Sequence, residues 1–200
     1  MTPVLTGLGL AAAAGLNAWV VLLLVNGLAL LLPQEFPGTT TAFLTSHGVV
    51  TAALVLFLAE FVADKIPIVD HLWNLAQTLL RPLVGALLVL ACVPEASAME
   101  RLLLALGGAA VTVSTHLAQV TTRLTSTAAT RGLAQVAVSL AEDVLALAFA
   151  ALVFFVPPFS AVFLGAIAIL LVADRKRVLR GLAVMFFRIR HPRRRARAEG

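Results

Sequence analysis

Long stretches without a charged side chain dominate this sequence. The apolar segments cover residues 4–32, 48–66, 76–93, 102–122, 133–156 and 159–173, and charged residues occur only in the second, third and fifth of them. A helix needs about 20 apolar residues to cross the hydrocarbon of a membrane. Only 12% of the residues are charged, against roughly a quarter in a soluble domain. The sequence therefore predicts an all-α, polytopic membrane protein with six transmembrane helices.

The two halves of the chain resemble each other. Residues 58–63 resemble residues 140–145, residues 84–89 resemble 164–169, and a weaker match pairs residues 8–12 with 106–110. Each half then forms a unit of three segments, one at about 4–93 and the other at about 102–173, within a transmembrane domain of residues 1–174. Because three is an odd number, the second unit is upside down in the membrane. The pattern predicts a 3+3 inverted repeat, which is a common plan among secondary transporters.

The distribution of basic residues agrees with six spans. If the N-terminus is cytoplasmic, every lysine and arginine except Arg101 falls on the cytoplasmic side. Cytoplasmic loops of membrane proteins carry this excess of positive charge. We therefore expect both termini on the cytoplasmic side of a bacterial cytoplasmic membrane.

Residues 175–200 form a separate basic tail. Apolar residues recur in it at helical spacing between arginines, a pattern typical of a helix that lies on a membrane surface. Its basic residues would attract anionic lipid headgroups. The terminal run 191–197 has no aromatic side chains to stack on bases, so the expected partner is the lipid bilayer and not a nucleic acid.

Acidic residues inside the apolar segments are the first candidates for function. Glu60 and Glu142 occupy matching positions in the two units. An ionisable side chain at bilayer depth costs at least ~2.5 kcal/mol, so it normally faces the interior of the bundle. Asp64 lies on the same helix face as Glu60, and Asp143 points about 100° away from Glu142. Two carboxylates brought together there would share a proton or bind a cation.

Two uncharged polar residues extend this candidate pathway. Asn17 lies in the middle of the first segment, and His116 lies at the matching place in the fourth. His116 could relay protons near neutral pH or make a structural hydrogen bond between helices. The acids also have a structural alternative, which is to form ion pairs with Lys65, Arg81 or Arg123 at the inner interface.

Residues 68–81 predict an amphipathic helix before the third span. Asp70 and Arg81 lie on its polar face and Trp73 lies on its apolar face. Such a helix would cap the bundle at the interface, or act as a gate or a surface for a partner. The single cysteine, Cys92, lies in an apolar run and excludes a disulfide framework or a thiolate metal cluster. We predict no metal site, and the sequence identifies no cofactor.

The polar pattern also carries a family resemblance. The relevant residues are 59–73, Thr78, Arg81-Pro82 and Gly85-Ala86 in the first half, and 116–123 and 139–143 in the second. Over most of residues 7–173 the chain resembles the bacterial multi-pass membrane family named domain of unknown function 4126. The family pattern often has an acid at the position of Asn74 and a histidine at that of Gln77, and their replacement argues against a metal site in this helix. The resemblance implies the multi-pass fold and no particular activity.

Enzyme motifs are missing from the sequence. It has no Gly-rich phosphate loop, no His-Glu-x-x-His and no serine nucleophile elbow. We therefore expect a small secondary carrier, not an enzyme, coupled to protons or another cation through the intramembrane carboxylates. The main alternative is a scaffold or accessory subunit that docks through residues 68–81 and the basic tail. A membrane enzyme or lipid-handling protein is a third possibility, and a homodimer or larger complex is compatible with so small a bundle.

Overall fold

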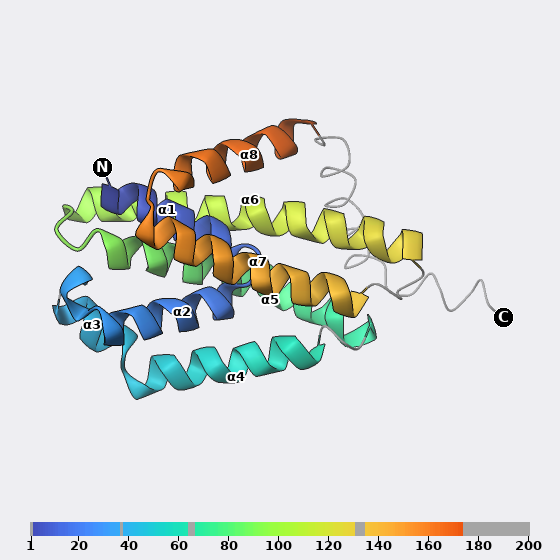
Figure 1. Ribbon diagram of the computed structural model, residues 1–200, viewed down its shortest axis with the longest axis horizontal. Helices are drawn as coiled ribbons and strands as arrows, with labels where there is room; N and C mark the ends of the chain where they lie inside the picture. The colour runs from blue at the N-terminus through green and yellow to red at the C-terminus, as the bar shows by residue number, and fades with distance from the viewer. Residues whose placement is uncertain (1, 37, 64–66, 131–134, 174–200) are drawn as a thin grey trace.

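The computed structural model describes residues 2–36, 38–63, 67–130 and 135–173, and every regular element in them is a helix (Figure 1). In chain order these are α1 (Thr2–Ala14), α2 (Ala18–Leu31), the 3₁₀ helix η1 (Pro33–Glu35), α3 (Gly38–Leu44), α4 (His47–Ala63), α5 (Pro67–Cys92), α6 (Ala98–Thr130), α7 (Gln135–Phe155) and α8 (Phe159–Ala173). The all-α class that the sequence predicts is confirmed for this part of the chain. The predicted tail helix lies outside the described residues.

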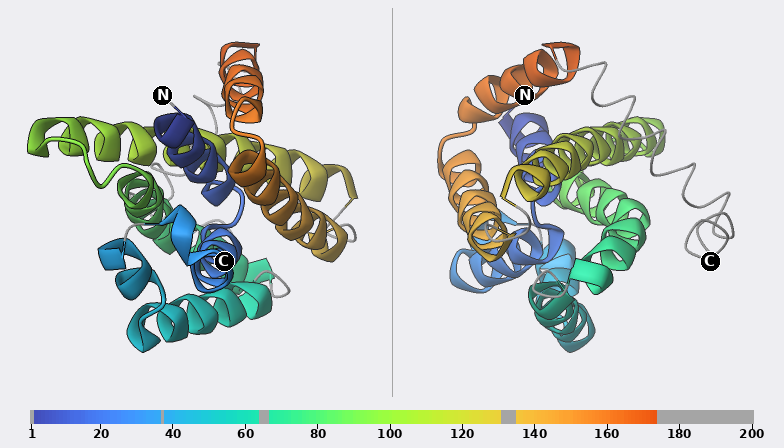
Figure 2. Two further views of the ribbon diagram at one scale, coloured as in Figure 1. Left: turned by 60° about the vertical axis from the view of Figure 1, so that its left-hand side comes forward. Right: turned by 90° about the vertical axis from the view of Figure 1, so that its right-hand side faces the viewer.

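Helix α1 lies at the centre of the bundle. It packs against α5, α6, α7 and α8, and Figure 2 shows these helices arranged around it. The four consecutive alanines at residues 11–14 are completely buried. Side chains this small let the backbones of neighbouring helices approach closely, so α1 can be surrounded on all sides.

Helices α1 and α2 form a hairpin. Near the start of α1, Pro3 lines a cavity together with the turn between α5 and α6. Just beyond the end of α2, Phe36 stacks on Phe154 of α7, with ring centroids 5.7 Å apart. That turn and the C-terminal end of α7 lie at the same end of the bundle, and α1 and α2 run in opposite directions (Figure 1). The tip of the hairpin is inside the bundle, where Gly15 packs against Thr115 in the middle of α6.

The hairpin corrects the expectation of one continuous helix over residues 4–32. The break at residues 15–17 has a local cause in Asn17, which has extended backbone angles and caps α2. Its side-chain oxygen accepts hydrogen bonds from the backbone N–H groups of Trp19 and Val20 at 3.1 and 3.0 Å. An N-cap of this kind satisfies N–H groups that have no partner at the start of a helix. The first apolar segment is thus two short helices.

Helix α5 also differs from its expected form. The predicted interfacial helix at residues 68–81 and the third span are one continuous helix that contains Pro82. Helix α6 is likewise longer than the expected segment and reaches Thr130. The ends of α7 and α8 lie close to those of the last two apolar runs, because Pro157-Pro158 ends one helix directly before the next begins.

Two or three helices in the described ranges are compatible with a membrane protein. Among the described residues, Ala98–Val120 and Val136–Phe155 are long and apolar enough to cross a membrane, and α3 with α4, which meet at 46°, could make a third span. Large apolar side chains are exposed along several helices, including Leu54, Val55, Leu58 and Val62 on α4 and Val162, Ile169 and Val172 on α8. Apolar surfaces of this extent are typical of contact with a membrane or with another protein.

Candidate functional site

Arg81 of α5 lies at the centre of a buried group of polar side chains. Only 1% of it is exposed, and its Nη2 forms an ion pair with Oε1 of Glu60 on α4 at 2.5 Å. Removing charges from water is costly, and a buried pair of this kind persists only where further hydrogen bonds satisfy both partners. The group, called the polar cluster below, consists of Glu60, Gln77, Thr78, Arg81, His116, Gln119 and Glu142.

The other terminal nitrogen of Arg81 connects α5 to the hairpin and to α6. Nη1 donates a hydrogen bond to the backbone oxygen of Gly15 at 2.6 Å and another to Oε1 of Gln119. It also lies 2.9 Å from Nδ1 of His116. Gly15 is at the tip of the hairpin, where the carbonyl no longer belongs to a helix. The break in the first segment therefore provides an acceptor for a buried cation.

Gln119 extends the cluster to α7. Its Nε2 donates to Oε2 of Glu142 at 2.8 Å and to the backbone oxygen of Leu16 at 2.9 Å. Glu60 and Glu142 are thus connected through Arg81 and Gln119. The sequence predicts that these two acids face each other, and the structure places a guanidinium and an amide between them.

Three longer contacts also belong to the cluster. Oε2 of Glu60 accepts a hydrogen bond from Nε2 of Gln77 at 3.3 Å. The Nε2 atom of His116 lies 3.3 Å from Oγ1 of Thr78, and its Nδ1 lies 3.2 Å from Oε1 of Gln119. Gln77 and Thr78 precede Arg81 by four and three residues, which is about one helical turn, so each lies beside Arg81 on the surface of α5.

A second polar contact lies beside the cluster. Nδ2 of Asn17 donates to Oδ1 of the half-buried Asp143 at 2.8 Å. Asn17 therefore has two roles, since its oxygen caps α2 and its nitrogen holds an acid of α7. Asp143 is brought to the N-terminal end of α2, where the helix dipole favours negative charge.

The structure brings together most of the predicted site residues that it describes. Glu60, His116 and Glu142 belong to the polar cluster, and Asn17 and Asp143 meet next to it. Arg81, which the sequence places at the interface, is inside the bundle because the interfacial helix continues into the third span. The remaining predicted residues are Trp73, which is half-buried on α5, Asp64 and Lys65, which lie outside the described residues, and Asp70 and Arg123, whose side chains also lie outside them.

Besides Thr78, the candidate residues from the sequence leave out four groups that complete the site. These are Gln77, Gln119 and the backbone carbonyls at residues 15 and 16. The density of hydroxyl and amide side chains over residues 112–122 indicates that α6 is central, but not which of them would be used. No three His, Cys, Asp or Glu residues in the described ranges are placed to hold a metal ion.

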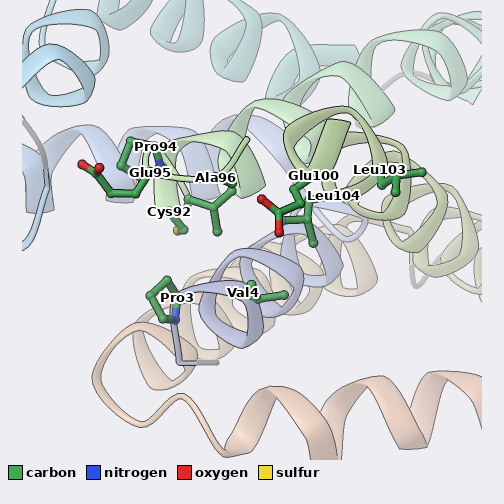
Figure 3. Close-up of a pocket in the computed structure, with 10 residues that line it drawn as sticks. Pro3, Val4, Cys92, Pro94, Glu95, Ala96, Glu100, Leu103 and Leu104 are labelled. Atoms are coloured by element: carbon green, nitrogen blue, oxygen red, sulfur yellow. The ribbon is translucent and has the colours of Figure 1, made fainter. Parts of the chain in front are cut away.

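A cavity of about 620 Å³ lies at the end of the bundle where the hairpin begins. Figure 3 shows its walls, which come from the start of α1, the end of α5, the start of α6 and the turn before it. The lining is mostly apolar, with the carboxylates of Glu95 and Glu100 as its charged groups. None of the lining residues belongs to the polar cluster, so this cavity is distinct from it.

Nearly the whole described bundle matches a known protein family. Residues 4–176 match the family described as Domain of unknown function (DUF4126). No curated protein and no solved structure matches the chain. The match includes the hairpin, the polar cluster and all the helices between them. The chain therefore belongs to the family of domain of unknown function 4126.

Proposed function

We propose that this protein is a small secondary carrier of a bacterial cytoplasmic membrane, coupled to protons or another cation through Glu60 and Glu142. The observation that carries the proposal is the hydrogen-bonded connection between these buried acids, which passes the broken tip of a helical hairpin. In many secondary transporters, discontinuous helices present free backbone groups to ions near the middle of the membrane. Ionisable side chains at that depth commonly belong to an ion pathway.

The proposed topology has a re-entrant hairpin. Helices α4 to α8 each cross the membrane, whereas α1 and α2 enter from one side and return to it. The C-terminal ends of α4, α6 and α8 lie at the end of the bundle opposite to the start of α1 (Figure 1). Lys65, Arg131 and Arg175 follow these ends in the sequence, so the positive-inside rule makes that end cytoplasmic. The N-terminus is then on the outer side, in contrast to the six-span expectation with both termini inside.

The helix directions support an inverted relation for part of the repeat. Helices α4 and α7, which carry Glu60 and Glu142, run in opposite directions, as do α5 and α8 (Figure 1). Helices α1 and α6 run in the same direction, so the weak match between residues 8–12 and 106–110 does not extend the inversion to them. We propose that α4–α5 and α7–α8 are two units with opposite orientations in the membrane, and that Glu60 and Glu142 occupy equivalent positions in them.

The proposed mechanism begins with a proton at Glu60. The Glu60 carboxylate holds Nη2 of Arg81, and the same guanidinium holds the hairpin tip through Nη1. Protonation would remove the negative charge that Arg81 is paired with, so the guanidinium would be held less firmly in place and could release the tip. The tip could then move relative to α5 and α6 and open the cluster toward one side. The structure corresponds in this scheme to a closed state with the tip held in place.

The cluster also supports a second candidate function, that of a scaffold or accessory subunit. The observation in its favour is that Glu60 and Glu142 are buried in hydrogen bonds, while the 620 Å³ cavity lies elsewhere. In a scaffold, Arg81 would hold the hairpin in the bundle permanently, and the tip would not change position. A partner would then dock on residues 68–81 and the basic tail, which are the surfaces that the sequence indicates.

Ion flux in liposomes distinguishes the two functions. Proton and cation flux is compared for wild type, Glu60→Gln, Glu142→Gln and the control Glu35→Gln, which alters an exposed acid of η1. A carrier gives flux in wild type and in the control, and a loss of at least tenfold in both cluster variants at equal reconstitution. Equal flux in all four proteins, or none in any of them, would refute the carrier. Stability measurements on the same samples show whether each variant is folded.

A further inference from the structure

Arg81 has more polar neighbours at its Nη1 than that nitrogen has hydrogens. Its Nη1 carries two hydrogens but lies within hydrogen-bond distance of the Gly15 carbonyl, Nδ1 of His116 and Oε1 of Gln119. Its Nη2 is used by Glu60. These groups come from α4, α6 and the hairpin tip. The position of the guanidinium, which these groups surround, is called the chamber below; the oxygens of Gly15, Glu60 and Gln119 accept hydrogen bonds there.

A further acceptor in this chamber has no donor. Gln77 is fully buried, and its Oε1 has no hydrogen-bond partner among the described residues. Gln77 precedes Arg81 by four residues, so the two side chains lie on the same face of α5, and its amide nitrogen contacts Glu60. A buried polar atom without a partner is costly. No donor within the described ranges satisfies this oxygen, so it is an acceptor that a bound ligand could use.

Arg81 is not bound in the strongest way available to it. The most stable arrangement of a guanidinium and a carboxylate is a two-pronged pair. Here Glu60 contacts only Nη2 of Arg81, its other oxygen is used by Gln77, and Nε of Arg81 has no partner in the described part of the chain. A competing cation could therefore replace Arg81 without having to break a two-pronged pair.

We propose that the chamber is a binding site for a small organic cation with several N–H donors, and that Arg81 is a tethered occupant that this substrate displaces. The proposal rests on the carrier function and specifies its substrate class. An ammonium or guanidinium group would donate to Glu60, to Oε1 of Gln77 and to the hairpin carbonyl. A bare alkali ion fits less well, because hard cations prefer an all-oxygen shell and His116 contributes a nitrogen.

Uptake by the wild-type protein is the main test, with radiolabelled guanidinium ion as the probe. We expect uptake into proteoliposomes that depends on Glu60 and is reduced roughly five- to tenfold by Gln77→Leu, which removes one hydrogen-bond acceptor. The matched control is Gln34→Leu, which alters an exposed glutamine of η1 and should leave uptake unchanged. Proton or sodium flux without guanidinium uptake would overturn this inference and leave the carrier function intact. The absence of any flux would remove both.

Binding provides a second readout that does not need transport. Arg81→Ala vacates the chamber, so guanidinium at millimolar concentration should raise the thermal midpoint of this variant more than an equal concentration of sodium chloride does. Adding Glu60→Gln should abolish the difference. The control Arg101→Ala, which alters an exposed arginine of α6, should show none. Equal effects of both salts on Arg81→Ala would contradict the site, and if this variant does not fold, the uptake measurements with Gln77→Leu still decide.

Discussion

Arg81 explains at the scale of single residues why the bundle can hold a broken helix. A carbonyl released from a helix in a membrane must find another donor, because no water is available to it there. The guanidinium supplies that donor to Gly15 while its charge is balanced by Glu60. Gln119 does the same for Leu16 and is oriented by Glu142. The hairpin tip and the buried charges therefore stabilise each other.

The ion pair predicts strong coupling between its partners. Arg81→Met or Glu60→Met alone should lower the free energy of unfolding by about 3–5 kcal/mol, because each leaves an uncompensated buried charge. The double variant should lose clearly less than the sum of the two. Chemical unfolding in detergent micelles measures all three, with Arg101→Met as an exposed control that should stay within about 0.5 kcal/mol of wild type. Additive losses would show that the two side chains do not interact.

Asn17 allows its two contacts to be separated. Asn17→Ala removes both the cap of α2 and the bond to Asp143, and should cost about 1–2 kcal/mol. Asn17→Ser keeps a capping oxygen but has no amide to donate to Asp143, so we expect it to recover the capping part only. The comparison is made by thermal unfolding. Equal losses in the two variants would mean that the cap contributes nothing measurable.

At the scale of helices, close packing depends on glycines where backbones cross. A Cβ added to Gly108 of α6 would lie 2.6 Å from a methyl group of Val89 and 2.8 Å from the backbone oxygen of Gly85. The adjacent Gly107 has no such neighbour, since its nearest atom, in Leu8, would be 3.9 Å away. One glycine is therefore required by the contact between α5 and α6, and the next is not.

This pair gives a matched test. Gly108→Ala should lower the free energy of unfolding by about 1–3 kcal/mol, because the extra methyl group forces α5 and α6 apart. Gly107→Ala should be neutral or stabilising by up to about 1 kcal/mol, since alanine is the better helix former. Unfolding curves of the two variants, measured side by side, test the helix crossing directly. Equal changes in the free energy of unfolding would contradict the described packing of α5 against α6.

Some of the helices can be predicted from the sequence, whereas the break in the first segment cannot. Long apolar runs and Pro157-Pro158 predict α7 and α8 well, because hydropathy and proline act locally. The break at residues 15–17 could not be found in this way, since glycine is common in membrane helices and Asn17 looks like a polar residue in mid-span. The acids of the site were found because charge is rare in apolar runs. Gln77 and Gln119 were not, because their roles depend on where α5 and α6 meet.

For the whole molecule, the path of the first segment decides which side of the membrane the N-terminus occupies. Both layouts place the α5–α6 turn outside and the basic residues after α4, α6 and α8 inside. They differ in the first segment, since a continuous span would bring the N-terminus inside and a re-entrant hairpin leaves it outside. The side of the N-terminus is therefore a direct measure of the fold in the membrane.

Cysteine labelling in intact cells distinguishes the layouts. In a Cys92→Ser background, Pro3→Cys places a thiol at an exposed position of the first turn of α1, and Ser97→Cys places one in the exposed turn before α6. A re-entrant hairpin predicts that a membrane-impermeant maleimide labels both. If it labels position 97 alone, and position 3 reacts only after the membrane is permeabilised, then residues 4–32 cross the membrane. The tip at Gly15 could not then meet Arg81 as described, and the proposed site would lose its hairpin carbonyl.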